Sequence, residues 1–163
     1  MQSTMEISSK KLQIIPFSHT HASVFKSLNL RWLDAYFKVE PIDEKVLSDL
    51  NTAILHKGGY IFMGALENKI IGCFALIPLA NGDFELSKMA VDPKYQGRKF
   101  GQQLLDFAID FAKSKQWGKL VLYSSRKLEN AIYIYRKKGF VEIPVEDGVP
   151  YERCDIKMEI IFN

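Results

Sequence analysis

The sequence predicts a mixed α/β fold of the α+β kind, in which a mostly antiparallel, twisted sheet is flanked by helices. Two observations predict it: three strand-like runs joined by turns occur between residues 60 and 91, and a loop, a helix and a further strand follow directly. The chain has 163 residues, of which 47% are hydrophobic and 25% charged. That length and balance are typical of one globular domain, so we expect a single domain over residues 1–163.

The first elements are a short strand and two helices. The segment Lys11–Phe17 has a strand-like pattern and contains Pro16 near its end. From Ala22 onwards, apolar residues recur at helical spacing until Pro41 breaks the run. Asp43 is then placed to cap a second, short helix.

Three strands in sequence come next. The runs Tyr60–Leu66 and Ile70–Ile77 flank a tight polar turn, which predicts an antiparallel hairpin. The Asn81-Gly82 pair tolerates positive φ and predicts a second turn. The run Phe84–Val91 is therefore the third strand of a meander.

The strongest helical pattern begins at Phe100. Its apolar residues form a stripe at positions i, i+4, i+8 and i+11, with Lys113 and Lys115 in the last turn and Gly118 as the expected stop. Leu120–Tyr123 is a short buried strand, so the helix is the crossover of a βαβ unit that should be right-handed.

The remaining elements are one helix and two strands. The helix is marked by four residues at helical spacing: Leu128, Ala131, Ile132 and Tyr135. It should end at Gly139, after two lysines. The segments Phe140–Ile143 and Arg153–Ile161 predict the last two strands, joined by a polar loop.

Composition and charge exclude several classes of protein. The net charge of +3 is too small to indicate a nucleic-acid partner, and no apolar run is long enough to span a membrane. The N-terminus lacks the pattern of a secretory signal, and the two cysteines, Cys73 and Cys154, predict free thiols, so we expect a cytoplasmic protein. His19 and His21 have no neighbouring ligands, and we expect no metal.

The stretch Gln96–Gly101 (QGRKFG) is the clearest candidate binding motif. A loop before a long helix presents unpaired backbone N–H groups and the positive end of the helix dipole, which together attract anions. The spacing fits neither a P-loop nor a dinucleotide-binding motif. Local spacing alone therefore leaves two interpretations open, a phosphate-binding loop and a simple helix start.

Two longer motifs resemble signatures of the GNAT superfamily of acyl-CoA-dependent N-acetyltransferases. "ELSKMAVDPKYQGRKFGQQLL" resembles its strand, V-[DH]-P turn, [RQ]-x-x-G-x-[GA] loop and helix, and "NAIYIYRKKGF" resembles its A-x-x-x-Y-x-[KR]-x-G-F motif. The resemblance covers most of the chain. It implies a GNAT-like sheet with a central strand–loop–helix acyl-CoA site, and transfer of an acetyl group from acetyl-CoA to a primary amine by direct attack through a tetrahedral intermediate.

Lys99 departs from the family pattern, because glycine is usual at that position. If the position needs positive φ, a lysine there is strained. The other members of the motif, Gln96, Gly97 and Gly101, match.

The resemblance also assigns roles to individual residues. Glu85 on the central strand is the candidate base that takes the proton of the amine, directly or through water; the alternative is a solvated carboxylate. Tyr135 matches the tyrosine that protonates the departing thiolate, although it also lies on the apolar stripe of its helix. Uninterrupted strand alternation would place Glu85, Ser87, Met89 and Val91 on one face.

Cosubstrate contacts are implied for a larger set. The strand is expected to bind the pantetheine arm, with the N–H of Met89 near the thioester oxygen, and the loop to bind the pyrophosphate. The expected contacts are Met89, Ala90, Val91, Gln96, Gly97, Arg98, Lys99, Gly101, Gln102, Ser125 and Asn130.

The acceptor side is less defined. Trp32 and Tyr36 are candidates for its wall, and Glu40 with Asp43 could attract a cationic amine. The acceptor itself, a small molecule or a peptide amine, stays open, as does the choice between monomer and homodimer. The alternative function is a non-catalytic acyl-CoA-binding regulatory module.

Overall fold

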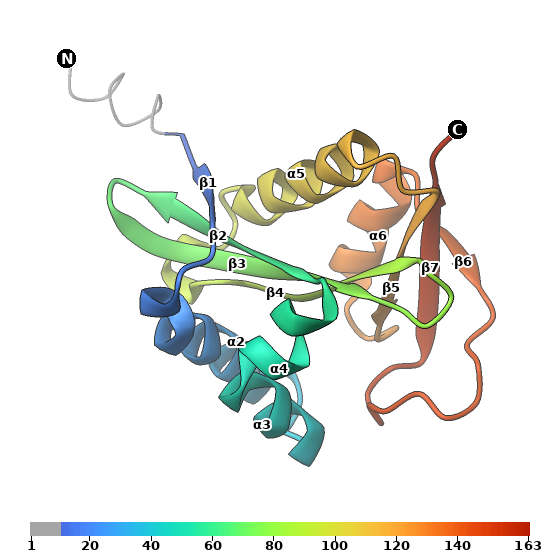
Figure 1. Cartoon of the computed structure of the whole chain (residues 1–163), viewed down its shortest axis with the longest axis horizontal. Coiled ribbons are helices and arrows are strands. Elements are labelled where there is room, and N and C mark those ends of the chain that lie inside the picture. Colours follow the sequence, from blue (N-terminus) through green and yellow to red (C-terminus); the bar gives the residue numbers. More distant parts are fainter. Residues whose placement is uncertain (1–10) are drawn as a thin grey trace.

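Within its described residues, a computed structural model of the chain has a sheet of seven strands, and Figure 1 shows how the strands are arranged. The structure describes residues 11–163, so the first ten residues of the expected domain lie outside the described residues. The strand order is β1-β2-β3-β4-β5-β7-β6, and every neighbouring pair is antiparallel except β4–β5. The predicted mixed, mostly antiparallel sheet is confirmed. Its strands are β1 (Gln13–Pro16), β2 (Tyr60–Leu66), β3 (Lys69–Pro78), β4 (Phe84–Val91), β5 (Lys119–Ser124), β6 (Val141–Ile143) and β7 (Ile156–Ile161).

Helices cover both faces of the sheet (Figure 1). The N-terminal helices α2, α3 and α4 lie on one face, while α5 and α6 lie on the other. Short 3-10 turns (η1 to η3) occur at His19–His21, Leu55–Lys57 and Pro93–Tyr95. The helix bounds are α2 (Ala22–Tyr36), α3 (Pro41–Ser48), α4 (Leu50–Ala53), α5 (Phe100–Ser114) and α6 (Glu129–Lys138).

Each face of the sheet has its own apolar core. Beneath α5 the buried residues include Phe74, Leu104 and Leu120, all with no exposed surface. Beneath α2 and α3 the core includes Phe25 and Ile54, which are equally buried. The predicted apolar stripe of α5 therefore packs on the sheet, and this packing holds the loop before α5 at the carboxyl end of the central strand β4.

The start of α3 differs from the prediction. The helix begins at Pro41, which stands in the first turn, where its missing N–H costs nothing. Glu40 is the N-cap, and Asp43 is the third helical residue, whose carboxylate accepts the Glu40 N–H at 2.9 Å. Asp43 therefore forms one half of a capping box and does not cap the helix itself.

Two further boundaries differ. Gln116, with φ of 59°, makes the left-handed turn after α5 that was expected at Gly118. Strand β7 begins at Ile156 and not at Arg153, because the Arg153 side chain reaches across to α3 and the chain there forms a turn. Gly139, with φ of 110°, ends α6 as predicted.

Candidate active site

A cleft opens where β4 and β5 part. The two strands pair at only three positions, from Phe84 with Leu120 to Leu86 with Leu122, although β4 continues to Val91. Beyond that point lies a cleft of about 980 Å³, between the second half of β4, the loop before α5, the β5–α6 connection and the end of α2. The splayed strands expose backbone and side chains that a closed sheet would bury.

A β-bulge at Lys88 divides β4. Cys73 pairs with Ala90 and Ala75 with Ser87, so two residues of β4 face one of β3, and Lys88 has φ of 58°. After the bulge, successive side chains of β4 alternate between the two faces of the sheet in the opposite phase. Met89 and Val91 pack on the α5 side with Leu86, whereas Ala90 faces α2, so Glu85 and Ser87 do not share a face with Met89 and Val91. The shared face was expected only for an uninterrupted strand, and the bulge removes that condition.

The loop before α5, together with the first turn of that helix, presents a row of free amides. Gly97 and Lys99 have φ of 78° and 63°. The first amide with a helical partner is that of Gln103, which donates to the Lys99 carbonyl at 3.1 Å. Within the described chain, the N–H groups of residues 97–102 have no hydrogen-bond partner. With the N-terminal dipole of α5, this row is suited to bind an anionic group.

Most of the sequence-predicted loop residues line the cleft. Arg98 does not, because its guanidinium lies over the rings of Tyr95 and Phe100, at 5.6 and 5.4 Å from their centroids. The loop residues that line the cleft are Gln96, Gly97, Lys99, Gly101 and Gln102.

The left-handed backbone at Lys99 leads to a stability prediction. A residue with a Cβ in this conformation costs about 1–2 kcal/mol, part of which glycine recovers. Lys99→Gly should therefore be more stable than Lys99→Ala by about 1 kcal/mol in urea denaturation. Both variants lose the same charge, so their difference isolates the backbone. Equal stabilities of the two variants would contradict the presence of backbone strain at Lys99.

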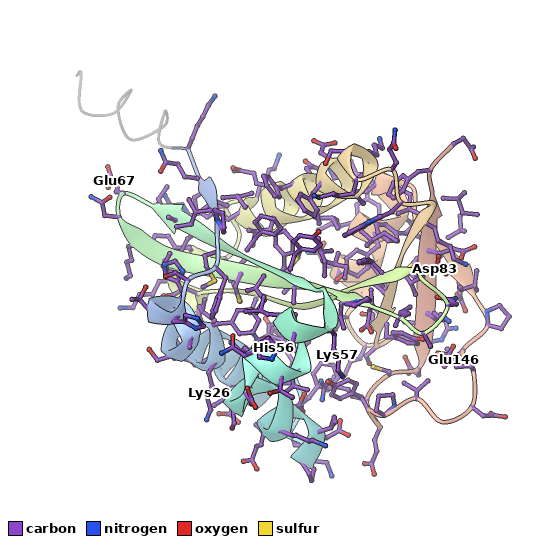
Figure 2. All side chains as sticks on the ribbon, viewed as in Figure 1. Lys26, His56, Lys57, Glu67, Asp83 and Glu146 are labelled. Carbon is purple, nitrogen blue, oxygen red and sulfur yellow. The ribbon has the colours of Figure 1, made fainter. Side chains whose placement is uncertain are left out.

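Glu85 lines the cleft with a half-buried side chain. Burial raises the pKa of its carboxyl from 4.5 to about 7, and the positive charge of Lys88 and a hydrogen bond with Ser87 only partly oppose this shift. Glu146, labelled in Figure 2, lies in the β6–β7 connection and adds to the rise. A carboxyl with a pKa near 7 can accept and release a proton at neutral pH.

Tyr135 lines the same cleft from α6. Its ring contacts Phe140 edge-on, with centroids 5.9 Å apart, and among the described residues its hydroxyl has no hydrogen-bond partner. Burial raises the pKa of the phenol, so the group is protonated at neutral pH. Ser125 and Asn130 also line the cleft, as do Met89, Ala90 and Val91.

The end of the cleft beside α2 only partly matches the acceptor wall that was expected from the sequence. Trp32 and Tyr36 line it as expected, with ring centroids 5.7 Å apart. Glu40 does not line it, because its carboxylate is buried and accepts hydrogen bonds from the Glu152 amide at 3.0 Å and the Arg153 guanidinium at 2.9 Å. Glu40 therefore cannot meet an amine in the cleft directly.

Five residues at this end form a network that was not predicted from the sequence. Asp43 accepts two hydrogen bonds from Arg153, both at 2.8 Å, and one from Lys88 at 3.4 Å. Lys88 also donates to the Tyr151 hydroxyl at 2.8 Å. Asp43 and Arg153 are 110 residues apart in the chain, so no local pattern indicates their contact. We call Glu40, Asp43, Lys88, Tyr151 and Arg153 the acceptor-end network.

Two features are absent from the described residues. They contain no group of three or more histidine, cysteine, aspartate or glutamate side chains that could hold a metal ion. They also contain no helix long and apolar enough to cross a membrane.

Comparison with known proteins agrees with the geometry. Residues 57–142 match the model of the acetyltransferase (GNAT) domain. An IAA acetyltransferase of Azospirillum brasilense is 31% identical over 113 residues, which are 68% of this chain and 72% of that protein. An uncharacterised Mycobacterium leprae protein is 41% identical over 61 residues, which are 37% of this chain, and the match spans only 16% of that protein's length.

Solved structures share the fold. A GNAT-family acetyltransferase from Staphylococcus aureus Mu50 superposes with a TM-score of 0.81 at 23% identity, covering 93% of this chain and 99% of that one. A GNAT-family acetyltransferase from Elizabethkingia anophelis with acetyl-CoA bound has a TM-score of 0.65 at 24% identity, covering 93% and 98%. The domain match and the Azospirillum relative, together with the splayed strands and the amide-lined loop, show that the chain belongs to the GNAT family of acetyl-CoA-dependent N-acetyltransferases.

Proposed function

We propose that this protein, as a single domain, transfers an acetyl group from acetyl-CoA to a primary amine by direct attack through a tetrahedral intermediate. The observation that carries the proposal is that Glu85, Tyr135 and the loop residues other than Arg98 all line one cleft between β4 and β5. A base, an acid and an anion-binding loop are the groups that this reaction requires.

Acetyl-CoA would lie along the cleft. The free N–H groups of residues 97–102 would bind the pyrophosphate, and the part of β4 from Met89 to Val91 would bind the pantetheine arm. The parting of the strands supports the latter role, because β5 pairs with β4 only as far as Leu86 and leaves this edge of β4 from Met89 to Val91 without a strand partner. In this arrangement the Met89 N–H stabilises the developing oxyanion.

Proton transfer would use the two ionisable groups. An alkylammonium has a pKa of about 10.4, so a base must remove its proton before attack. Glu85, with a pKa of about 7, is ionised in a substantial fraction at neutral pH and can act directly or through water. The neutral amine then attacks the thioester carbon, and as the C–S bond breaks the Tyr135 hydroxyl donates a proton to the departing thiolate. The nitrogen gives up its second proton as the amide forms, and this proton restores the Tyr135 hydroxyl through water.

Two measurements test the proposal. Acetyl-CoA should raise the melting temperature, because a ligand that binds only the native state stabilises it. Thiol release should then follow on addition of amines. A shift without thiol release from any amine would favour the non-catalytic acyl-CoA-binding module, and no shift at all would contradict both functions.

Removing only the hydroxyl of Tyr135 tests the role of this residue. Tyr135→Phe keeps the ring contact with Phe140 and should lower kcat by roughly 10²-fold with little change in acetyl-CoA affinity. Tyr133→Phe is the matched control, because Tyr133 lies on the same helix with 65% of its surface exposed. Full turnover in Tyr135→Phe from pH 6 to 9 would remove this residue from the mechanism.

A further inference from the structure

The carboxylates of the acceptor-end network have no capacity left for a ligand. Asp43 is completely buried and accepts four hydrogen bonds, from the Glu40 amide, Lys88 and twice from Arg153. Two carboxylate oxygens offer about four acceptor sites, so Asp43 is saturated. Glu40 lies behind it, outside the cleft lining. A cationic acceptor would therefore find no free carboxylate here.

The cations of the same network keep free donors. Arg153 uses three of its five N–H donors, two on Asp43 and one on Glu40. Lys88 uses two of its three, on Asp43 and Tyr151. Arg153, Lys88 and Tyr151 all line the cleft, and the side chains of Arg153 and Lys88 are only 15% and 6% exposed. This end of the cleft thus offers hydrogen-bond donors that are largely shielded from solvent, where hydrogen bonds between charged groups are strong.

Glu85 is close enough to this group for its charge to interact with that of Lys88. Glu85 and Lys88 lie on the same strand, β4, and both line the cleft with Arg153. An acceptor with its amine at Glu85 can therefore place its other end against Lys88 and Arg153. The group that satisfies both cations and the Tyr151 hydroxyl is an anion with several acceptor atoms, and a carboxylate fits a guanidinium edge.

We propose that the amine acceptor carries a carboxylate, as a free amino acid does, and that Arg153 and Lys88 recognise it. The inference rests on the proposed function and narrows its substrate class. Trp32 and Tyr36, which line the same end, would contact the apolar part of such a molecule. The saturated Asp43 acts as the fixed support that orients both cations.

The test compares pairs of acceptors that differ only in the carboxylate. Suitable pairs are L-phenylalanine with phenethylamine, L-lysine with cadaverine, and 4-aminobutyrate with propylamine. Thiol release from acetyl-CoA should give a kcat/KM at least about tenfold higher for the carboxylated member of one or more pairs, since hydrogen bonds to charged groups are worth that much. Higher kcat/KM for the amines without a carboxylate would overturn the inference and leave the proposed function intact.

A substitution of Arg153 tests whether this residue recognises the carboxylate of the acceptor. Arg153→Lys keeps the charge opposite Asp43 but removes the paired guanidinium donors, so KM for the carboxylated acceptor should rise about tenfold while KM for acetyl-CoA stays constant. Lys38→Gln is the control, because Lys38 is 79% exposed and pairs with Glu152, beside Arg153, outside the cleft lining. An equal loss for both members of a pair would overturn the recognition role.

The remaining outcomes of these experiments distinguish a failure of the carboxylate inference from a failure of the proposed function. Thiol release with other amines but with none of the carboxylated acceptors would overturn the carboxylate inference and leave the proposed function intact, because the pairs cover aromatic, cationic and short linear acceptors. Stabilisation by acetyl-CoA without thiol release from any amine would favour the non-catalytic module and reject both. Absence of stabilisation by acetyl-CoA would instead reject the proposed function, and with it the inference that rests on it.

Discussion

Replacing Glu85 with glutamine should lower kcat by roughly 10²- to 10⁴-fold, the range by which a positioned acid or base accelerates proton transfer. The substitution keeps the size of the side chain and removes its ability to accept a proton from the amine. Acetyl-CoA affinity should change little, because the amides that would bind the pyrophosphate lie beyond β4, in the following loop and the first turn of α5. Glu44→Gln, the same change on the exposed surface of α3, serves as the control.

The pH profile sharpens this prediction. With a pKa of about 7, Glu85 should give kcat/KM of the wild-type protein a rising limb centred near pH 7. That limb should be absent from the residual activity of Glu85→Gln. A limb that persists unchanged in the variant would assign the titration to another group.

The Glu85→Gln substitution should lower activity but raise the stability of the folded protein above pH 7. Because the pKa of Glu85 is raised from 4.5 to about 7 in the folded state, the folded protein holds this proton more tightly than the unfolded chain. The resulting stabilisation is complete below pH 4.5 and is lost as pH rises through 7. At pH 8 the ionised, half-buried carboxylate is a cost, so Glu85→Gln should be more stable than wild type by about 1–2 kcal/mol. Equal stabilities at pH 8 would contradict the raised pKa.

Replacing Asp43 with alanine should give the largest loss of stability, about 3–5 kcal/mol, which for a domain of this size is roughly 10 °C in melting temperature. The carboxylate is fully buried and holds Arg153 and Lys88. Its removal leaves two buried cations with only Glu40 as a carboxylate partner, and it opens the capping box of α3.

Asp34→Ala is the control for this substitution, since Asp34 is exposed on α2 and its loss should cost only a few tenths of a kcal/mol. The pH dependence has a defined sign. Burial alone would raise the pKa of Asp43, but the hydrogen bonds from Arg153 and the Glu40 amide, with the charge of Lys88, lower it. Its contribution to stability is therefore present at neutral pH and lost in acid. A cost below 1 kcal/mol at pH 7 would show that the network is not a structural support.

Much of the fold was predictable, because each element carries its own local signal. The stripe of α5, the hairpin turns and the glycine that ends α6 depend on side chains within a few residues of each other. The errors fell on positions that neighbours in space control. Arg153 leaves the expected strand because its guanidinium binds α3, and Gln116 adopts the left-handed turn that was expected at a glycine.

The candidate site divides in the same way. The loop, Glu85 and Tyr135 were identified from two continuous motifs, and all of them line the cleft except Arg98. The bulge at Lys88 was not predicted, because it depends on how β3 and β4 pair. It places Glu85 on the opposite face of β4 from Met89 and Val91.

The sequence by itself determined the family, the α+β sheet and the strand–loop–helix unit, since these depend on short-range periodicity and on contiguous motifs. Only the tertiary structure decided the character of the acceptor end. The acidic segment around Glu40 and Asp43 suggested an attraction for cations, but Arg153, from the far end of the chain, neutralises it together with Lys88. Charge in a sequence is additive, whereas the charge that a ligand meets depends on which groups have already paired.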